Sequence, residues 1–508
     1  MTERASTLLG RLAGAWARRL GAAPSTDVAT EPPALDPRLA GFADKLCSAA
    51  DAMARVRAGD HVFVGTACAT PRSLVAALEA RRPAPADVEL LHFLTDHAVP
   101  HAEDGTPQTA FRHRSFFVGQ DMREAVRRGL ADYVPISIAR VPGLMAIGRI
   151  PVDVALIQVS MPDEYGYVSL GVSVDVCAAA VSRARLVIAE VNPAMPRSMG
   201  DSMLHVGEID ALVAVDTPVI EYQHPAQPAQ VVERIARYIG SLIDDGATLQ
   251  VGLGRFSHEA FKHLTDRKDL GIHSDVITDA IIPLLERGVI TGRHKSQQRG
   301  KIVASFAMGS RKLYDLIDRN PLFSLQPVDA VCDARTIAAQ HKMVSVTQAF
   351  AVDLTGQVCV DQFEGRFYGG LAAQGEFMQG AALSPGGKAI VCLASTDDSA
   401  APGAPVSRIR ATLAAGEGVG VGRADVHYVV TEYGIAYLFG KSVRERAVAL
   451  IQIAHPDCRP ALFEQARALG YLPEGQKLRN LHDYPVELEH PITLKDGRHL
   501  LLRPATAN

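Results

Sequence analysis

The chain has 508 residues, of which 47% are hydrophobic and 21% are charged, with a net charge of −4. This composition excludes a disordered, collagen-like or disulfide-scaffold protein, and the charge balance gives no sign of a nucleic-acid-binding surface. The seven cysteines are scattered without a C-x-x-C pair, which is typical of reduced thiols in the cytoplasm, and no apolar run is long enough to cross a bilayer. The length suggests about two or three domains.

The N-terminal segment differs in character from the rest of the chain. Residues 6–23 contain no acidic residue, and on a helix Leu9, Leu12, Trp16 and Leu20 fall on one stripe with arginines on the opposite side. This pattern predicts a short amphipathic helix. Such a helix can make weak contact with anionic lipid, direct the chain to an organelle or pack on a partner. A frayed arm, or a helix packed on its own domain, is the alternative. The proline-rich residues 24–37 are expected to form a linker.

Short apolar runs then alternate with helical periodicity, first up to about residue 228 and again beyond it. Strands separated by helices predict parallel sheets in an α/β fold. In the first half we expect strands at 61–65, 88–94, 154–159, 186–191 and 212–215 and helices at 73–80 and 122–129. In the second half we expect strands at 249–253, 271–278, 301–306, 343–352, 389–393 and 427–431 and helices at 443–453 and 460–468.

A polar, proline-bearing stretch around residues 221–230 separates the two halves. It predicts a domain boundary near residue 228. Together with the N-terminal linker and the C-terminal tail, this boundary divides the chain into four parts. They are an N-terminal helix and linker (1–40), two α/β domains (41–228 and 229–475) and a polar tail (476–508).

One strand-to-helix turn has the composition of a ligand site. Residues 249–256 (LQVGLGRF) place Gly252 and Gly254 where a ligand can approach the backbone, helix amides can receive anionic oxygen, and Arg255 adds a cation. A tight turn that binds nothing has the same sequence. Asp275 follows about 20 residues later, at or inside a predicted strand end, where α/β folds place their ligands. A helix cap or a structural ion pair is the alternative for Asp275.

From residue 43 to residue 471 the sequence resembles the acetyl-CoA hydrolase/transferase family. The blocks that carry the resemblance are 159–171 (VSMPDEYGYVSLG), 190–210, 249–254, 270–279 and 429–456. The resemblance implies two CoA-transferase-type α/β domains with the active site at their interface, and a homodimer. It also implies an acyl-CoA and a small carboxylic acid as the binding partners.

In that family a glutamate attacks the acyl-CoA thioester, and an acyl anhydride and then a glutamyl-CoA thioester form. The resemblance therefore implies covalent catalysis by a carboxylate, with a glycine-rich loop that stabilises the oxyanion. It implies no metal and no organic cofactor, because coenzyme A is itself a substrate. The CoA-binding residues implied by the alignment are Gly252, Leu253, Gly254, Arg255, Phe256, Thr347, Ala373 and Asp398.

The chain departs from the family pattern at the positions closest to the chemistry. Asp275 stands where the family has its nucleophilic glutamate, so the carboxylate is one methylene, about 1.5 Å, shorter. The family's G-x-G-G oxyanion loop reads Gly370-Leu371-Ala372-Ala373. Thr347 replaces an asparagine, and Asp398 replaces a lysine.

These departures leave three functions open. The family implies a CoA-transferase acting on a short-chain acyl-CoA. A hydrolase with Asp275 as general base is a second function, and a CoA-binding or regulatory protein with little turnover is a third. The tail at 492–504 (ITLKDGRHLLLRP) resembles the opening strand of GNAT-type acetyltransferase domains, and an ordinary edge strand fits it equally well.

Overall fold

The computed structural model describes residues 36–96, 98–102, 105–222, 230–363, 365–397 and 405–475, and the backbone of 492–493 and 499–500. Contacts divide the chain into residues 1–41 and residues 42–508. The predicted amphipathic helix at 6–23, most of the linker and Asp398 lie outside the described residues. The tail contributes two short antiparallel strands, β25 (Ile492–Thr493) and β26 (His499–Leu500), where a single strand was expected.

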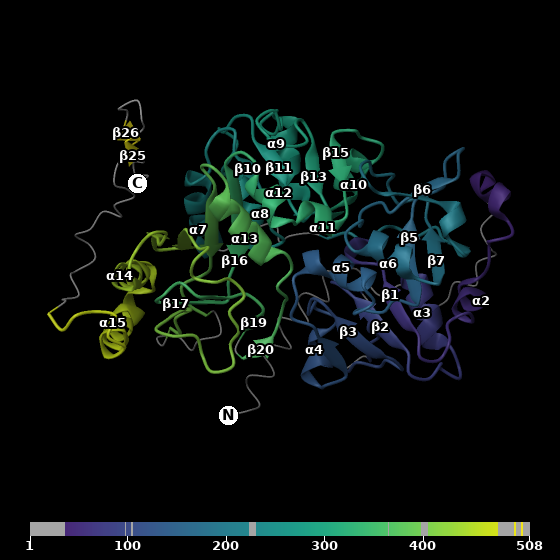
Figure 1. Ribbon diagram of the computed structural model, residues 1–508, viewed down its shortest axis with the longest axis horizontal. Helices are drawn as coiled ribbons and strands as arrows, with labels where there is room; N and C mark the ends of the chain where they lie inside the picture. Colours follow the sequence, from purple (N-terminus) through teal and green to yellow (C-terminus); the bar gives the residue numbers. More distant parts are fainter. Residues whose placement is uncertain are drawn as a thin grey trace. The chain divides into compact units, whose positions relative to one another are not determined.

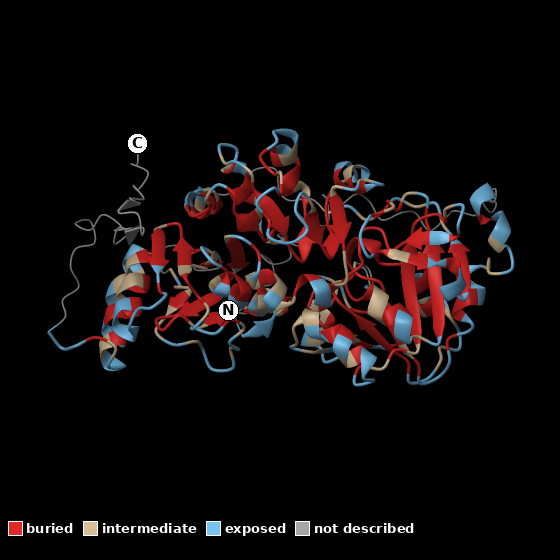
Figure 2. Cartoon of the chain, turned by 45° about the horizontal axis from the view of Figure 1, so that its top comes forward, coloured by how far each residue is buried: buried red, intermediate tan, exposed pale blue. Residues whose placement is uncertain are grey.

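The first half of residues 42–508 forms a seven-stranded parallel sheet with the order β4-β3-β2-β1-β5-β7-β9. Its strands are β1 (His61–Val64), β2 (Glu89–His92), β3 (Arg112–Ser115), β4 (Ala131–Tyr133), β5 (Val154–Val159), β7 (Leu186–Val191) and β9 (Ala211–Ala214). Its helices are α2 (Ala49–Met53), α3 (Arg72–Ala80), α4 (Arg123–Arg127), α5 (Val141–Ala146) and α6 (Cys177–Arg183). The inner strands β5 and β7 are buried along their whole length, as is typical of parallel strands covered on both faces (Figure 2).

The second half forms an eight-stranded sheet with the order β15-β13-β11-β10-β16-β21-β23-β24, in which only β24 runs antiparallel. Its strands are β10 (Thr248–Leu249), β11 (Gly271–His273), β13 (Ile302–Ala304), β15 (Phe323–Leu325), β16 (Met343–Gln348), β21 (Lys388–Cys392), β23 (Tyr428–Thr431) and β24 (Gly434–Tyr437). This arrangement confirms the predicted α/β class.

Helices surround the second sheet, and α14 and α15 pack side by side near its β24 edge (Figure 1). The helices are α7 (Gln230–Ser241), α8 (Arg255–Lys262), α9 (Ile282–Glu286), α10 (Arg311–Ile317), α11 (Val328–Val331), α12 (Ala334–Ala338), α13 (Gln374–Leu383), α14 (Val443–Ile453) and α15 (Arg459–Ala468). Smaller strands are β6 (Tyr167–Ser169), β8 (Met203–His205), β12 (Val276–Ile277), β14 (Phe306–Ala307), β17 (Ala351–Asp353), β18 (Val358–Cys359), β19 (Gln362–Phe363), β20 (Arg366–Phe367) and β22 (Ile409–Arg410).

Backbone hydrogen bonds join the two halves. The N–H groups of Val174 and Asp175 donate to the carbonyl oxygen of Ser305 at 3.0 and 3.2 Å, and the N–H of Ala307 donates to the carbonyl of Val172 at 2.7 Å. Ser305, between β13 and β14, therefore lies where the second sheet meets the first half of the chain. The predicted boundary at residue 228 falls in residues 223–229, outside the described part, and stays a prediction.

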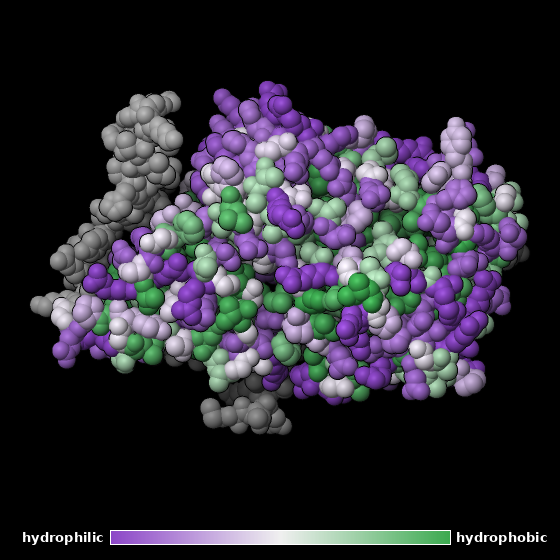
Figure 3. Space-filling model, viewed as in Figure 1, coloured by the Kyte–Doolittle hydropathy of each residue, from purple (hydrophilic) through white to green (hydrophobic). Residues whose placement is uncertain are grey.

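In the view of Figure 3, hydrophilic side chains cover much of the surface and hydrophobic side chains form separate patches between them. Within the described residues, no helix is both long and apolar enough to cross a membrane.

Candidate functional site

Asp275 lies at a break between two strands. The sequence predicts one strand over residues 271–278, but the structure has β11 before Ser274 and β12 after Asp275. The carbonyl oxygen of Asp275 accepts hydrogen bonds from the N–H groups of Ser305 and Phe306 at 2.9 and 3.0 Å. Ser305 also accepts hydrogen bonds from Val174 and Asp175 of the first half of the chain, and Ala307, the residue after Phe306, donates to Val172. Asp275 is therefore fixed at the interface between the two sheets.

The Asp275 carboxyl group is buried among neutral hydrogen-bond donors. Its residue is 9% exposed, and the Ser274 hydroxyl donates to its Oδ1 at 3.3 Å. Burial raises the pKa of Asp275 to about 6. Hydrogen bonds from the Val276 backbone and the Gln250 side chain act in the opposite direction and lower the pKa, but their effect is smaller. At neutral pH the group is a carboxylate, and a more basic one than an exposed aspartate. Such a shift is common at reacting carboxylates.

Gln250 was not anticipated from the sequence. Its Oε1 accepts a hydrogen bond from the hydroxyl of Ser345 at 2.7 Å, which leaves its amide N–H groups to bond Asp275. Ser345 lies on the neighbouring strand β16, and Gln250 follows β10 directly. A glutamine within an apolar run belongs to no recognisable motif. Its contacts with Ser345 and Asp275 become visible only from the pairing of β10 with β16.

Asp275→Asn is expected to stabilise the protein at pH 7 by roughly 2–3 kcal/mol. The folded-state pKa is raised from 3.8 to about 6, so the charged group opposes folding once the pH exceeds both values. The gain should be absent below about pH 4, grow between pH 4 and 6, and stay constant above that. Scanning calorimetry across this range measures it. Asp329→Asn, at an exposed position, should show no such pH-dependent gain.

The turn at residues 252–256 connects β10 to α8. A Cβ on Gly252 would lie 2.7 Å from the Oγ of Ser257, and one on Gly254 would lie 2.5 Å from the Oε1 of Gln348. A side chain at either position would therefore have to displace Ser257 or Gln348. Among the other predicted residues, Leu253 is half-buried, Arg255 is exposed at the first turn of α8, and the Phe256 ring is in the core at 1% exposure.

Two side-chain oxygens near this turn are buried without a partner. The Oγ1 of Thr347 and the Oε1 of Gln348 make no hydrogen bond to any described residue. Thr347 is 2% exposed and occupies the end of β16, next to β10. Buried oxygens without donors are costly unless a ligand supplies the donors. Gln348 is a second residue that sequence reasoning missed.

The predicted oxyanion loop packs against the first half of the chain. The N–H of Val118 donates to the carbonyl of Gly369 at 3.0 Å, and the N–H of Ile138 donates to the carbonyl of Ala372 at 2.8 Å. A Cβ on Gly370 would lie 2.8 Å from Cδ2 of Phe117. The loop is therefore held at the interface by contacts from a different sheet.

The two alanines of this loop have different surroundings. Ala372 has a φ of +45°, a left-handed conformation that favours glycine and costs a residue with a Cβ about 1–3 kcal/mol. Ala373 is fully buried and precedes the first turn of α13. The glycine-to-alanine change at residue 372 thus puts backbone strain into the predicted oxyanion loop.

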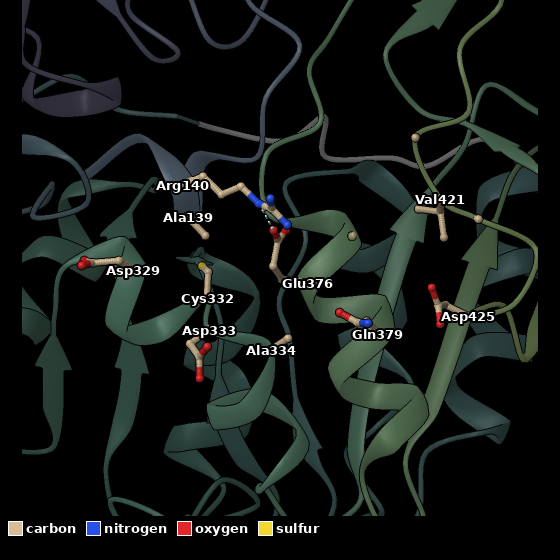
Figure 4. Close-up of a pocket in the computed structure, with 13 residues that line it drawn as sticks. Ala139, Arg140, Asp329, Cys332, Asp333, Ala334, Glu376, Gln379, Val421 and Asp425 are labelled. Atoms are coloured by element: carbon tan, nitrogen blue, oxygen red, sulfur yellow. Dashed lines mark ion pairs between the residues drawn. The ribbon is translucent and has the colours of Figure 1, made fainter. Parts of the chain in front are cut away.

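A cavity of about 450 Å³ lies between α11, α12, α13 and the loop at 420–425 (Figure 4). Glu376 projects into it and pairs with Arg140 at 3.8 Å. Cys332 also lines the cavity, and the pKa of its thiol is raised well above the usual range by burial and by the charges of Asp275 and Glu376. Asp275 itself is not in the cavity wall. Cys332 lies within the electrostatic reach of both carboxylates.

Glu432, a further carboxylate at a turn of the second sheet, is bonded by the N–H and the hydroxyl of Ser395 at 2.9 and 2.6 Å. Both of its oxygens are thus engaged. The described bond from a side-chain hydroxyl to Asp275, from Ser274, is longer at 3.3 Å.

Models of both domains of one family match the chain. The acetyl-CoA hydrolase/transferase N-terminal domain matches residues 37–221, and the C-terminal domain of that family matches residues 309–466. The 4-hydroxybutyrate coenzyme A transferase of Clostridium kluyveri is 42% identical over 424 residues, which are 84% of this chain and 97% of that protein. The succinyl-CoA:cyclohexane-1-carboxylate CoA transferase of Geobacter metallireducens is 37% identical over 432 residues, 84% of this chain and 96% of that protein.

Solved structures give the same result. RipA from Yersinia pestis has a TM-score of 0.79 at 33% identity and covers 86% of this chain and 100% of its own. The 4-hydroxybutyrate CoA-transferase from Porphyromonas gingivalis has a TM-score of 0.71 at 33% identity and covers 84% of this chain and 98% of its own. Two matched domain models and relatives aligned over most of their length establish that the chain belongs to the acetyl-CoA hydrolase/transferase family.

Proposed function

We propose that this chain is an acyl-CoA:carboxylate CoA-transferase that acts on a short-chain acyl-CoA, with Asp275 as the nucleophile. The observation that carries the proposal is the buried Asp275 carboxylate, fixed by its backbone at the interface of the two sheets beside the turn at residues 252–256. Relatives that share 33–42% of their residues with the chain are named as CoA-transferases for butyryl, succinyl and 4-hydroxybutyryl groups.

In the first step an oxygen of Asp275 attacks the thioester carbon of the acyl-CoA. The C–S bond breaks, the CoA thiolate leaves, and an acyl–aspartyl anhydride remains. The thiolate then attacks the aspartyl carbonyl carbon, which releases the acyl group as a free carboxylate and leaves an aspartyl-CoA thioester. An acceptor carboxylate reverses both steps and departs as the new acyl-CoA. No net proton, electron or water is consumed.

Backbone N–H groups of the loop at residues 370–373 would stabilise the oxyanion of each tetrahedral intermediate. The hydrogen bonds from Val118 and Ile138, which hold this loop against the first half of the chain, support that role. Coenzyme A is a substrate in this scheme, and we propose that the reaction needs no metal or organic cofactor. The unpartnered oxygens of Thr347 and Gln348 can accept hydrogen bonds from the amide N–H groups of the pantetheine arm.

The direct test is to incubate the protein with acetyl-, propionyl- or succinyl-CoA, with and without acceptor acids, and to analyse the products. A transferase should produce a new acyl-CoA only when an acceptor acid is present. CoA release without acceptor, with labelled water oxygen in the product acid, would instead show a hydrolase in which Asp275 activates water. CoA binding without either product would contradict both enzymatic functions.

Gly254→Val is expected to weaken CoA binding about 10-fold or more, because even a Cβ at this position collides with Gln348. Arg255→Ala should weaken it less, through loss of one exposed charge. Calorimetric titration with CoA measures both effects. Gly422→Val is the matched control, since a Cβ there meets no heavy atom within 4 Å. Unchanged CoA affinity in Gly254→Val would remove this turn from the binding site.

We further propose a cytoplasmic homodimer, on the basis of the scattered cysteines and the family resemblance. Elution as a monomer at micromolar concentrations would count against the dimer.

We also propose weak membrane contact through residues 6–23, which is tested by co-sedimentation with anionic liposomes. Deletion of residues 1–23 should abolish that contact, and binding that survives the deletion would contradict it.

A further inference from the structure

The hydroxyl group of Ser274 lies between the candidate nucleophile and the strand end that leads into the turn at residues 252–256. Ser274 is fully buried and stands between the end of β11 and Asp275. Its Oγ accepts a hydrogen bond from the N–H of Val251 at 2.9 Å. Val251 is also fully buried and immediately precedes Gly252. Ser274 therefore contacts both the residue proposed to react and the segment proposed to bind coenzyme A.

The Ser274 hydroxyl has one proton and two acceptors for it. The carbonyl oxygen of Val251 lies 3.1 Å from Oγ, and the Oδ1 of Asp275 lies 3.3 Å from it. Because a hydroxyl group donates a single hydrogen bond, only one of these acceptors receives the proton at a time. Rotation about the Cβ–Oγ bond moves the proton from one acceptor to the other, and no heavy atom has to move.

The charge of Asp275 decides which acceptor is preferred. Hydrogen bonds to an ionised group are about twice as strong as those between neutral groups, so a free Asp275 carboxylate attracts the hydroxyl proton. In an aspartyl anhydride or an aspartyl-CoA thioester the group is neutral. Its carbonyl oxygen then has no advantage over the carbonyl of Val251, which is the nearer of the two. The direction of the hydroxyl should therefore follow the covalent state of Asp275.

The direction of the hydroxyl also decides how firmly the turn is anchored. Val251 already forms an isolated antiparallel bridge with Val276. While the hydroxyl points to Asp275, Ser274 holds Val251 through the N–H group alone. When the hydroxyl points to Val251, Ser274 bonds both the N–H and the carbonyl of that residue. The residue that precedes the turn is then held by two bonds from Ser274 in place of one.

We propose that Ser274 is a positioning residue of the transfer reaction, whose hydroxyl donates to the Asp275 carboxylate before the reaction and to the Val251 carbonyl once Asp275 is acylated or linked to coenzyme A. This inference rests on the proposed function, because it assumes that Asp275 becomes covalently linked. The hydroxyl keeps its own proton throughout, so the change transfers no proton. It orients the carboxylate for attack and anchors the turn at 252–256 while coenzyme A is attached.

The first test is the amount of aspartyl-CoA at equilibrium. Wild-type protein and Ser274→Ala are mixed with a fixed ratio of acyl-CoA to product acid, quenched and analysed by intact-protein mass spectrometry. Ser274→Ala should raise the equilibrium constant for aspartyl-CoA formation about 5-fold, because the free carboxylate loses a stronger hydrogen bond than the intermediate does. Ser274→Thr retains the hydroxyl and should restore the wild-type value.

Ser384→Ala is the matched control. The buried Ser384 hydroxyl accepts from the N–H of Met343 at 3.0 Å and donates to the carbonyl of Gln340 at 2.7 Å. This variant loses the same pair of backbone hydrogen bonds as Ser274→Ala but no bond to a carboxylate. Its melting temperature should fall comparably, and the equilibrium constant for aspartyl-CoA formation should stay unchanged.

The second test needs no reaction. The Ser274 hydrogen bond lowers the pKa of Asp275, so Ser274→Ala should move the midpoint of Asp275 ionisation upward by about 0.5 pH in the ligand-free protein. Infrared difference spectroscopy follows the protonated carboxyl band that is missing from Asp275→Asn. Gln250 and the Val276 backbone still bond Asp275 in this variant, so we expect it to fold. If it unfolds, Ser274→Cys has a weaker donor of similar size and should shift both measurements less, in the same directions.

The two tests separate this inference from the proposed function. If aspartyl-CoA forms on the wild type but Ser274→Ala changes neither measurement, the inference is overturned and the proposed function stands. A raised midpoint with an unchanged equilibrium constant would also overturn it, because the hydroxyl would then stay on Asp275 in the intermediate. A raised midpoint in a protein that forms no aspartyl-CoA and transfers no CoA would contradict the proposed function and leave only the bond of Ser274 to the free carboxylate.

Discussion

Asp275→Ala is expected to lower the rate of CoA transfer by about four orders of magnitude, because it removes the atom that forms both covalent intermediates. CoA affinity should remain close to that of the wild type, since the hydrogen-bond partners of the Asp275 side chain lie outside the turn at 252–256. Transfer is measured as exchange of CoA between two acids, and affinity by calorimetry.

Two further variants make this result specific. Asp275→Asn keeps the shape of the side chain and should lose transfer equally, which separates charge from packing. Glu376→Gln neutralises the carboxylate that pairs with Arg140 in the neighbouring cavity and should retain transfer. Full activity of Asp275→Ala together with loss of activity in Glu376→Gln would show that Glu376 is the nucleophile.

Asp275→Glu is expected to raise the rate of transfer about 10- to 100-fold. The side chain is one methylene shorter than the family's glutamate, and a misplacement near 1 Å can cost about 100-fold. The backbone cannot make up the difference, because the Asp275 carbonyl is held by the N–H groups of Ser305 and Phe306. Asp275→Gln adds the same volume without charge and controls for packing through its melting temperature.

The oxyanion loop sets a second limit on this gain. Ala372→Gly should stabilise the protein by about 1 kcal/mol, because glycine adopts the +45° φ without strain. If the alanines obstruct the oxyanion site, Asp275→Glu alone will change little, and the triple variant with Ala372→Gly and Ala373→Gly will restore turnover. A drop in activity in both variants would contradict the view that reach and loop geometry limit this enzyme.

The sequence predicts most of the strands whose side chains are all buried. Strands β5 and β7 have the predicted bounds, since each is apolar at five of its six positions, as buried strands of a parallel sheet are. Strand β3, with the sequence RHRS, was not predicted. Its buried His113 is satisfied by hydrogen bonds to His92 and Thr109, at 3.2 and 2.9 Å, which no local pattern indicates.

In the candidate site, too, the sequence predicts the residues that lie within contiguous motifs and misses those that come together only in the fold. Asp275 and the turn at 252–256 lie within such motifs, so the sequence identifies them. The break in the predicted strand at residues 274–275 depends on hydrogen bonds from Ser305 and Phe306, 30 positions away along the chain. The positions of Gln250 and Gln348 depend on the pairing of β10 with β16, which periodicity cannot show.

The central claim is that Asp275 becomes covalently linked to coenzyme A, and one measurement tests it most directly. The protein is exposed to an acyl-CoA without acceptor, treated with borohydride, digested and analysed by mass spectrometry. The account predicts that the thioester is reduced and that the peptide containing Asp275 carries an alcohol in place of the carboxyl group, at that residue alone. An unmodified Asp275 with reduction at Glu376 or Glu432, under conditions where transfer proceeds, would contradict it.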